Sequence, residues 1–389
     1  MIELAMLPQA IRSMGDVDLP QAEAAARLSD GRRRSVRLDA LTPDEIARLR
    51  EEAVGPGVVV LPGIHGASGK SPVIVVADDP SLRRLGTNLE TRGLRAVGSA
   101  LRTALTAYDR TAFGLAFADG TLLDLADGTR VMGVLNVTPD SFAGGGAVLT
   151  PQQAADAAAR MLDEGADLVD VGGESTRPGA DPVLEDEEVR RVVPAIEAIK
   201  RRCPVRISVD TTKVAVARLA IEAGADLVND VSGFADAEML AVIRAMRVPA
   251  IAMHRRGTPK TMQQDTQYVD LLSSVVGFLR NRVEKAVAAG VADDKILIDP
   301  GLGFGKSAAG NLQILRELPT LKSVGRPIVV GASRKAFIGG TLDLPVGERL
   351  EGSLAVAAFA AWSGAHVVRA HDVAATKRVT RMIDTIRTT

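Results

Sequence analysis

Polar or charged side chains end each of eight short apolar runs in the second part of the sequence. The runs cover residues 131–137, 167–172, 205–210, 225–230, 248–254, 295–300, 327–333 and 365–371. The polar residues at or just after their ends are Asn136, Glu174 with Thr176 and Arg177, Asp210, Asn229 with Asp230, His254, Asp299, Ser333 to Lys335, and Arg369 with His371. Convergent polar groups of this kind are typical of a small-molecule site.

The types of these residues indicate two kinds of contact. Asp210, Asn229 and Asp299 offer acceptors and an amide to a flat heterocycle, because a carboxylate can accept two parallel hydrogen bonds from adjacent N–H donors. The residues that offer positive charge to phosphate or carboxylate oxygens are Arg177, Lys335, Arg369 and His371. A polar heteroaromatic ring that carries an anionic group fits both sets.

Each polar end also has a simpler interpretation. Asn136 and Thr138 can satisfy turn backbone, and Asp210 with Thr211 can cap the helix that follows. The glycine-rich stretch 301–307 can be a flexible loop. We favour a shared site because eight polar ends would meet at one mouth if the runs are strands of a closed barrel.

The pattern between the runs favours such a barrel. Segments with helical periodicity, among them 151–166, 186–202, 213–225 and 268–291, alternate with the apolar runs. Strands that are apolar throughout need cover on both faces, so the sequence predicts a (β/α)8 TIM barrel, in the α/β class, over residues 111–389. An open doubly wound sheet is the structural alternative.

The segment 113–133 holds two Asp-Gly turns between alternating runs, which predicts a β-hairpin. A hairpin directly before the first barrel strand would plug the amino-terminal mouth of the barrel.

Residues 1–110 fall outside the barrel pattern and predict a separate small α/β domain whose role is not indicated. Strand-like runs lie at 57–63 and 71–79, and a helix pair is expected over 81–109. The stretch 63–71 resembles a phosphate-binding loop, but Ile64 replaces the required glycine and a strand with Pro72 follows, so we reject a nucleotide site. The arginines at 32–34 are interpreted as a solvated charge run.

Composition limits the functional classes. The formal net charge of -1 and the 3% aromatic content argue against nucleic acid as a partner. The chain has one cysteine, Cys203, which fits a reducing compartment. The first residues lack the features of a signal peptide and no run reaches the ~18 apolar residues of a membrane span, so we expect a cytoplasmic protein without membrane contact.

Eight motifs occur in the order and spacing of bacterial dihydropteroate synthase, and the resemblance extends from about Phe113 to the C-terminus. They are "MGVLNVTPDSF", "DVGGESTRPGA", "ISVDTTK", "VNDVSG", "PKTMQ", "IDPGLGFGK", "VGASRKAFIG" and "GAHVVRAHDV". The resemblance implies a transferase that joins 4-aminobenzoate to 6-hydroxymethyl-7,8-dihydropterin diphosphate. Diphosphate would leave first with the help of Mg2+, and the product would be 7,8-dihydropteroate for folate synthesis. It also implies a homodimer and a target of sulfonamides, which mimic 4-aminobenzoate.

The resemblance further implies roles for individual residues. Pterin binding would involve Asp210, Asn229, Met253, Asp299, Lys335 and Arg369. Diphosphate would meet Asn136, Thr176, Arg369 and His371, with Asn136 also holding Mg2+. The 4-aminobenzoate pocket would comprise Phe142, Arg177, Pro178, Phe304 and Lys335. The residues implied in catalysis are Arg177, Lys335, Asp140 and Phe142, the last two from a mobile loop over 138–146.

Two features depart from the family pattern. Ala336 stands where many members have a serine whose hydroxyl helps to hold the 4-aminobenzoate carboxylate, so we expect binding weakened by about 1 kcal/mol. Arg255 and Arg256 stand where uncharged residues are frequent, and we interpret them as surface-exposed.

Two other functions compete with the synthase. A methyltetrahydrofolate-binding methyltransferase barrel binds a similar pterin edge, but its reaction does not require the "STRP" and "SRK" segments, which would face diphosphate and the arylamine. A catalytically inactive barrel kept as a binding protein would show substitutions among the strand-end residues, and Ala336 is the notable one.

Overall fold

The computed structural model describes residues 2–6, 33–55, 58–62, 71–138 and 149–389. These residues form two compact units. The first comprises residues 1–110 with two later segments, 268–277 and 316–325, and the second comprises the rest of the chain. Both short segments lie within the stretch for which the sequence predicts a barrel.

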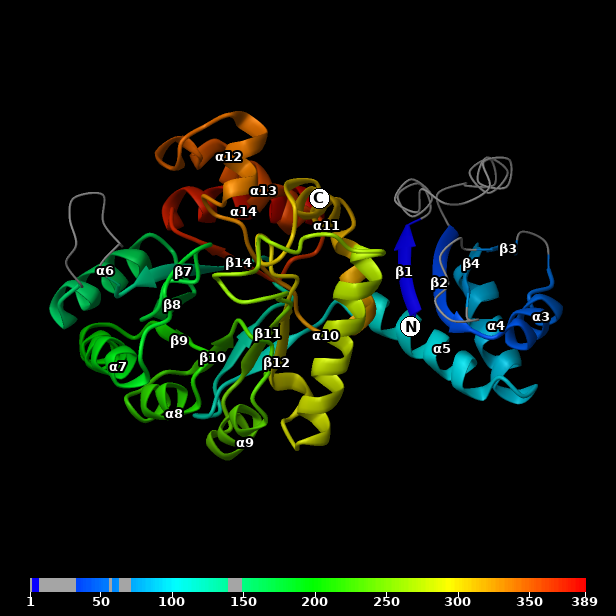
Figure 1. The fold of residues 1–389 in the computed structure, drawn as a ribbon, viewed down its shortest axis with the longest axis horizontal. Helices are drawn as coiled ribbons and strands as arrows, with labels where there is room; N and C mark the ends of the chain where they lie inside the picture. Colours follow the sequence, from blue (N-terminus) through cyan, green and yellow to red (C-terminus); the bar gives the residue numbers. More distant parts are fainter. Residues whose placement is uncertain (1, 7–32, 56–57, 63–70, 139–148) are drawn as a thin grey trace. The chain divides into compact units, whose positions relative to one another are not determined.

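The second unit is built around an eight-stranded parallel sheet (Figure 1). Its strands are β7 (Arg130–Asn136), β8 (Leu168–Gly172), β9 (Arg206–Asp210), β10 (Leu227–Asp230), β11 (Ala250–Met253), β12 (Ile296–Asp299), β13 (Val329–Gly331) and β14 (Val367–Ala370). The order in the sheet is β12-β11-β10-β9-β8-β7-β14-β13. A parallel bridge between Ile298 and Ile328 joins the two ends, so the sheet is nearly closed into the predicted barrel.

Helices surround these strands in Figure 1. They are α6 (Pro151–Asp163), α7 (Glu185–Arg202), α8 (Val214–Glu222), α9 (Ala237–Met246), α11 (Ala308–Arg316), α12 (Ala336–Leu342), α13 (Leu350–Trp362) and α14 (Val373–Thr388), with 3-10 turns η1 (Asp293–Lys295) and η3 (Val346–Glu348). Helix α10 (Leu271–Ala288) begins in a segment of the first unit and continues in the second, and the 3-10 turn η2 (Leu318–Val324) belongs to the first unit. The start of α6 shows how local sequence sets such bounds. The Thr150 hydroxyl accepts from the backbone of Gln153, whose side chain accepts from the Thr150 backbone, and Pro151 occupies the first turn.

The amino-terminal mouth of the barrel is filled by the predicted hairpin. Strands β5 (Gly114–Ala116) and β6 (Leu122–Asp124) pair antiparallel. Their apolar residues form one core with the first inward residues of the barrel strands, and this core contains Phe113, Leu115, Phe117, Leu125, Met132, Leu168, Leu227, Ile251, Leu297, Val329 and Val367. Arg206 stacks on the Phe117 ring at 4.4 Å and pairs with Asp119 at 2.8 Å, which ties the hairpin to β9.

The described residues between 2 and 109 in the first unit form a four-stranded antiparallel sheet in the order β1-β2-β4-β3 and three helices. The elements are β1 (Ile2–Met6), β2 (Arg33–Leu41), α3 (Pro43–Glu52), β3 (Val59–Pro62), β4 (Ser71–Asp78), α4 (Asp79–Thr91) and α5 (Arg95–Asp109). The two expected strands and the helix pair are confirmed. The phosphate-loop-like stretch lies outside the described residues up to position 70, and strand β4 follows it, as expected.

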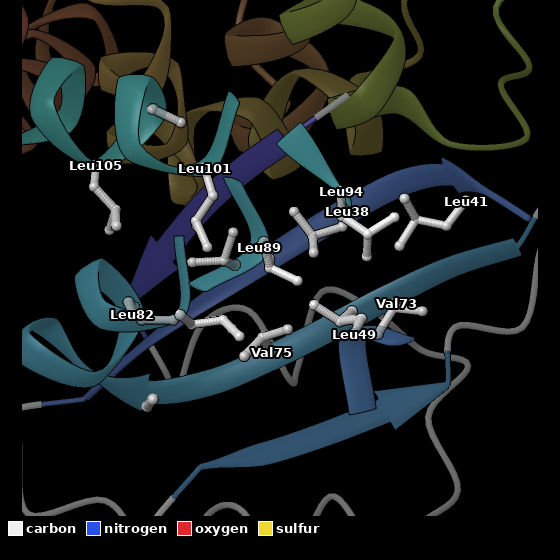
Figure 2. Packing of buried hydrophobic residues seen from close by; sticks show 14 of the residues in the cluster. Leu38, Leu41, Leu49, Val73, Val75, Leu82, Leu89, Leu94, Leu101 and Leu105 are labelled. Carbon is white, nitrogen blue, oxygen red and sulfur yellow. The ribbon is translucent and has the colours of Figure 1, made fainter. Parts of the chain in front are cut away.

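Aliphatic residues on alternate positions of β2 and β4 pack against leucines of the helices (Figure 2). Helices α4 and α5 approach closely at two glycines, because a Cβ added to Gly98 would lie 2.4 Å from the carbonyl oxygen of Gly86. The interpretation of residues 32–34 as a solvated charge run is wrong for Arg34. This residue lies in β2 and forms ion pairs with Asp79 at 3.0 Å and Asp109 at 2.6 Å, because a strand places every second side chain over its neighbours.

None of the helices in the described part of the chain combines the length and apolar character needed to cross a bilayer.

Candidate active site

A connected group of buried polar side chains lies inside the barrel near the carboxyl ends of its strands. The Nε atom of Arg369 donates to Oδ2 of Asp170 at 2.5 Å, and Nη2 of Arg369 donates to Oδ2 of Asp210 at 2.8 Å. The amide nitrogen of Asn229 donates to the same Asp170 oxygen at 3.0 Å. Four strands therefore contribute to one hydrogen-bonded group.

The two-residue period of a strand explains why these side chains face inward. The inward apolar layer at the hairpin contains Leu168, Leu227, Ile251, Leu297 and Val367. Two residues further along the same strands stand Asp170, Asn229, Met253, Asp299 and Arg369. The next inward layer is therefore largely polar.

Several acceptor atoms in this layer are left for a ligand. The Oδ1 atom of Asp210 is buried and makes no hydrogen bond to any described residue. The Asn229 nitrogen is engaged by Asp170, which leaves its carbonyl oxygen as the ligand-facing acceptor. Asp299 accepts from the Gly301 backbone at 2.6 Å through Oδ1, which leaves Oδ2. Three converging acceptors match a heterocycle with several N–H donors.

A lysine and an aromatic ring border this acceptor set. The Lys335 ammonium donates to the Leu302 carbonyl oxygen and lies 4.7 Å from the centre of the Phe304 ring. Phe304 also belongs to a small buried cluster with Met253, Met262 and Val231. Met253, implied in pterin binding, and Phe304, implied in the 4-aminobenzoate pocket, therefore belong to one buried cluster.

Burial shifts the ionisation of these groups. Burial, followed by the charge of Asp170, raises the pKa of Asp210 to about 7, although Arg369 opposes the shift. Burial likewise raises the pKa of Asp299 and lowers the pKa of Lys335 to about 8, while each of the two opposes the shift of the other. Such opposed shifts are frequent at functional sites.

His371 is neutral at pH 7, which corrects its assignment as a source of positive charge. Burial and then the charge of Arg369 lower the pKa of His371 to about 4. Its Nδ1 lies 3.0 Å from the Ser333 hydroxyl, so the imidazole can still donate or accept a hydrogen bond. Arg177 also contributes to this shift, which brings its guanidinium into the same electrostatic neighbourhood.

The segment after β8 forms a rim of the mouth. Thr176 is half-buried, whereas Arg177 and Pro178 are exposed. The backbone of Gly179 donates to the Pro259 carbonyl oxygen at 2.9 Å, which joins this rim to the segment after β11. Arg177 and Pro178 are therefore accessible to a molecule that enters the mouth from this side.

Asn136 ends β7 in a half-buried position, and its side chain makes no hydrogen bond to any residue that the structure describes. The predicted catalytic residues Asp140 and Phe142, like most of the loop 138–146, lie outside the described residues. Among the described residues, no cluster of three or more His, Cys, Asp or Glu side chains could hold a metal ion.

Three polar strand ends serve the fold instead of facing the mouth. His254 is buried against Lys306 and the Phe278 ring, and burial lowers its pKa to about 3. Asp230 accepts from the backbone of Ser232 at 2.7 Å, and Glu174 pairs with Lys213. The expectation that every polar end faces one mouth is wrong here because strand parity turns some of these side chains outward.

Two simpler interpretations are also wrong. Asp210 does not cap α8, since the cap position is Lys213 and no side chain caps it, although the Thr211 hydroxyl accepts from the Lys213 backbone at 3.2 Å. The stretch 301–307 is an ordered loop, because the buried Lys306 donates to the carbonyl oxygens of Gly301 at 2.8 Å and Phe304 at 3.0 Å. Sequence reasoning missed both Lys306 and Asp170, although a charged residue inside the apolar run "LVDVG" was a visible signal.

The interpretation of Arg255 and Arg256 as exposed is wrong for Arg255, which is half-buried. The side chain of Arg256 is 39% exposed and pairs with Asp265 at 2.5 Å.

Comparison with known proteins identifies the family. The family model described as "Pterin binding enzyme" matches residues 132–371. The dihydropteroate synthase of Synechocystis sp. is 45% identical over 268 residues, which is 68% of this chain and 93% of that protein.

Solved structures agree with this match. The Yersinia pestis dihydropteroate synthase in a sulfonamide drug complex superposes with a TM-score of 0.68 at 43% identity, covering 71% of this chain and 100% of that one. The Xanthomonas albilineans dihydropteroate synthase with 4-aminobenzoic acid gives a TM-score of 0.67 at 41% identity, covering 72% and 100%. The chain therefore belongs to the pterin binding enzyme family, among its dihydropteroate synthases, which are transferases.

Proposed function

We propose that this chain condenses 6-hydroxymethyl-7,8-dihydropterin diphosphate with 4-aminobenzoate, giving 7,8-dihydropteroate and diphosphate. The observation that carries the proposal is the set of acceptors on Asp210, Asn229 and Asp299. Family membership supports the reaction, and a related synthase has been solved with 4-aminobenzoic acid.

The pterin is bound through its pyrimidine edge. Its amino group and ring N–H groups donate to Asp210, Asn229 and Asp299, and the Lys335 ammonium donates to ring acceptors. Met253 and Arg369 pack on the two faces of the ring. The burial of the carboxylates supports this arrangement, since Asp210 and Asp299 are each 7% exposed and the buried Oδ1 of Asp210 has no partner among the described residues.

Diphosphate leaves first. The bond between the pterin methylene carbon and the diphosphate oxygen breaks, and the electron pair departs with diphosphate. Arg369 and the donors on Thr176 and His371 stabilise the departing anion. The charge of Arg369 and the neutral state of His371 support these roles, because one supplies charge and the other a hydrogen bond.

The arylamine nitrogen of 4-aminobenzoate then forms a bond to the cationic methylene carbon, and the proton that it loses passes to the released diphosphate or to water. Arg177 and Lys335 bind its carboxylate, while Pro178 and Phe304 lie against its ring. Phe142 and Asp140, which lie outside the described residues, keep the binding and catalytic roles that the resemblance implies. The contact between Lys335 and the Phe304 ring supports a pocket at this point. Ala336 begins α12 and lacks the hydroxyl that would add one more contact.

Mg2+ bound at Asn136 would neutralise charge on diphosphate. The donor set fits this ion, because Mg2+ usually takes one or two protein oxygens and completes its shell with phosphate oxygens and water. The Asn136 carboxamide is uncommitted among the described residues, so its oxygen is available.

The protein acts as a cytoplasmic homodimer and as a sulfonamide target. Helix α13 is apolar on all sides, and Phe359 and Trp362 on it are 42% and 56% exposed. Met382 and Ile386 on α14, a helix that packs against α13, are 60% and 47% exposed, and exposed apolar side chains on two adjacent helices favour self-association. A free buried Cys203 fits the cytoplasm. The sulfonamide complex of the Yersinia pestis relative supports the drug assignment.

The deciding experiment measures diphosphate release from the dihydropterin diphosphate with Mg2+, with and without 4-aminobenzoate. We expect release coupled to dihydropteroate formation and stimulated by the arylamine. Pterin binding without product would instead favour a binding relative or a methyltransferase.

A further inference from the structure

Asp170 is a buried carboxylate at the centre of the site for which the proposed reaction has no direct use. It is 0% exposed, in the middle of β8. Its Oδ2 accepts from Arg369 at 2.5 Å and from Asn229 at 3.0 Å, while its Oδ1 has no partner among the described residues. It therefore connects two groups that the reaction does use.

We propose that Asp170 is a positioning residue that sets which atoms of Asn229 and Arg369 face the pterin. The inference rests on the proposed function, because it explains how the pterin subsite is prepared before the substrate arrives.

The first effect of Asp170 is on the orientation of Asn229. A carboxamide has a donor end and an acceptor end that exchange when the group rotates by half a turn. A carboxylate only accepts, so Asp170 holds the Asn229 nitrogen and directs the Asn229 oxygen toward the ligand. Without this anchor the amide can present its nitrogen to a pterin N–H, which would place two donors together.

The second effect is on the plane of Arg369. Its guanidinium is held by Asp170 through Nε and by Asp210 through Nη2, and this two-point contact restricts the rotation of the group. Nη1 makes no hydrogen bond to a described residue and is left for a ligand. A donor that is already oriented loses less freedom when the substrate binds.

A purely structural role explains this arrangement poorly. Two carboxylates share one guanidinium, and the charge of Asp170 contributes to the raised pKa of Asp210. Burial of such a group is often no more stabilising than apolar packing. The amino-terminal inward layer of the same barrel is apolar, so the fold itself does not require charge in its interior.

The test compares Asp170 with a matched aspartate directly before the amino end of the same strand. Asp167 precedes β8 and accepts from Lys377 at 2.7 Å and from the Val131 backbone at 2.8 Å, outside the site. The variants are Asp170→Ala, Asp170→Asn, Asp167→Ala and Asp167→Asn in the full chain. Calorimetry with the dihydropterin diphosphate and Mg2+ gives pterin affinity, steady-state assays give KM for 4-aminobenzoate, and urea unfolding gives stability.

We expect Asp170→Ala to weaken pterin affinity about 10- to 100-fold, since two buried donors lose their acceptor. Asp170→Asn keeps one acceptor oxygen and should restore most of that affinity. The KM for 4-aminobenzoate should change less than threefold in both. The Asp167 variants should lose stability and retain pterin affinity within about twofold. Equal pterin affinity in the wild type and both Asp170 variants would overturn the inference.

A double-mutant cycle covers the case in which Asp170→Ala folds poorly. Asp170→Leu, which removes both acceptor oxygens but fills the space of the side chain, is combined with Asn229→Ala, and we expect a smaller combined loss of pterin affinity than the product of the single losses. Independent losses would show that Asp170 does not act through Asn229. If the wild-type protein does not bind the pterin at all, the proposed function fails as well, whereas wild-type binding with unaffected Asp170 variants refutes this inference alone.

Discussion

The two ends of the barrel are built on the same strands but have opposite interiors. At the amino end, Leu115 and Phe117 of the hairpin meet apolar residues such as Leu168 and Leu297. Two residues further along the same strands, Asp170 and Asp299 occupy the equivalent inward positions.

The amino end of the barrel core therefore serves stability, and the carboxyl end serves ligand binding. The amino end gains free energy from apolar burial, at roughly 25 cal/mol per Å2. The carboxyl end holds buried charges whose pKa values are shifted, and a protein retains such groups where a ligand completes their hydrogen bonds. Substitutions at the two ends should therefore affect different measurements.

The largest effect is expected at the amino end. Leu115→Ala should lower the free energy of unfolding by about 2–5 kcal/mol, because a fully buried leucine leaves a cavity in the plug. Pterin affinity, measured by calorimetry, should stay within about twofold. Leu122→Ala in the same hairpin, where the side chain is 67% exposed, serves as the control and should change stability by less than about 0.5 kcal/mol. A large loss of pterin affinity in Leu115→Ala would contradict the assignment of the amino end to stability alone.

The corresponding change at the carboxyl end is Asp299→Ala. It should weaken pterin affinity by about 1–3 kcal/mol or more, because the heterocycle loses a buried acceptor. Asp294→Ala, in the exposed 3-10 turn η1 that precedes the same strand, is the matched control and should bind normally. Calorimetry that finds equal affinities for the two variants would remove Asp299 from the pterin site.

The ionisation of Asp210 makes the carboxyl end sensitive to pH. Since its pKa is raised to about 7, the carboxyl gains a proton below neutrality, and pterin affinity should fall about five- to tenfold between pH 8 and pH 6. The folded state binds this proton more tightly than the unfolded state, so the contribution of Asp210 to stability is present below pH ~4 and is lost as pH rises through 7.

Asp210→Asn provides the control for this pH effect. In this variant, the pterin affinity and the free energy of unfolding should no longer change with pH near neutrality. If the pterin affinity of Asp210→Asn changes with pH as that of the wild type does, another group is responsible for the titration.

The smallest effect concerns Ala336 at the start of α12. Ala336→Ser should strengthen 4-aminobenzoate binding by about 1 kcal/mol, the scale of one hydrogen bond, seen as a lower KM for 4-aminobenzoate. Pterin affinity should not change. An unchanged KM would mean that the new hydroxyl does not reach the carboxylate.

The barrel could be predicted because its strands are buried on both faces and therefore read as continuous apolar runs between helices. Strand β2 of the first unit was missed because its apolar residues Val36 and Leu38 alternate with Arg37 and Asp39. Alternation is a strand signal, but the adjacent arginines suggested a solvated segment. Propensity alone could not show that Arg34 would find Asp79 and Asp109, which lie far away in the chain.

The sequence by itself determined the repeated elements, the polar strand ends and the motifs shared with the synthases, because these depend on local pattern and residue type. The tertiary structure decided which polar ends face the barrel interior, as Asn229 does, and which serve the fold, as the adjacent Asp230 does. It also decided that Asp170 joins Asn229 to Arg369 and that His371 is neutral. Strand parity, closure of the sheet and burial control these outcomes, and all three depend on contacts between residues distant in the chain.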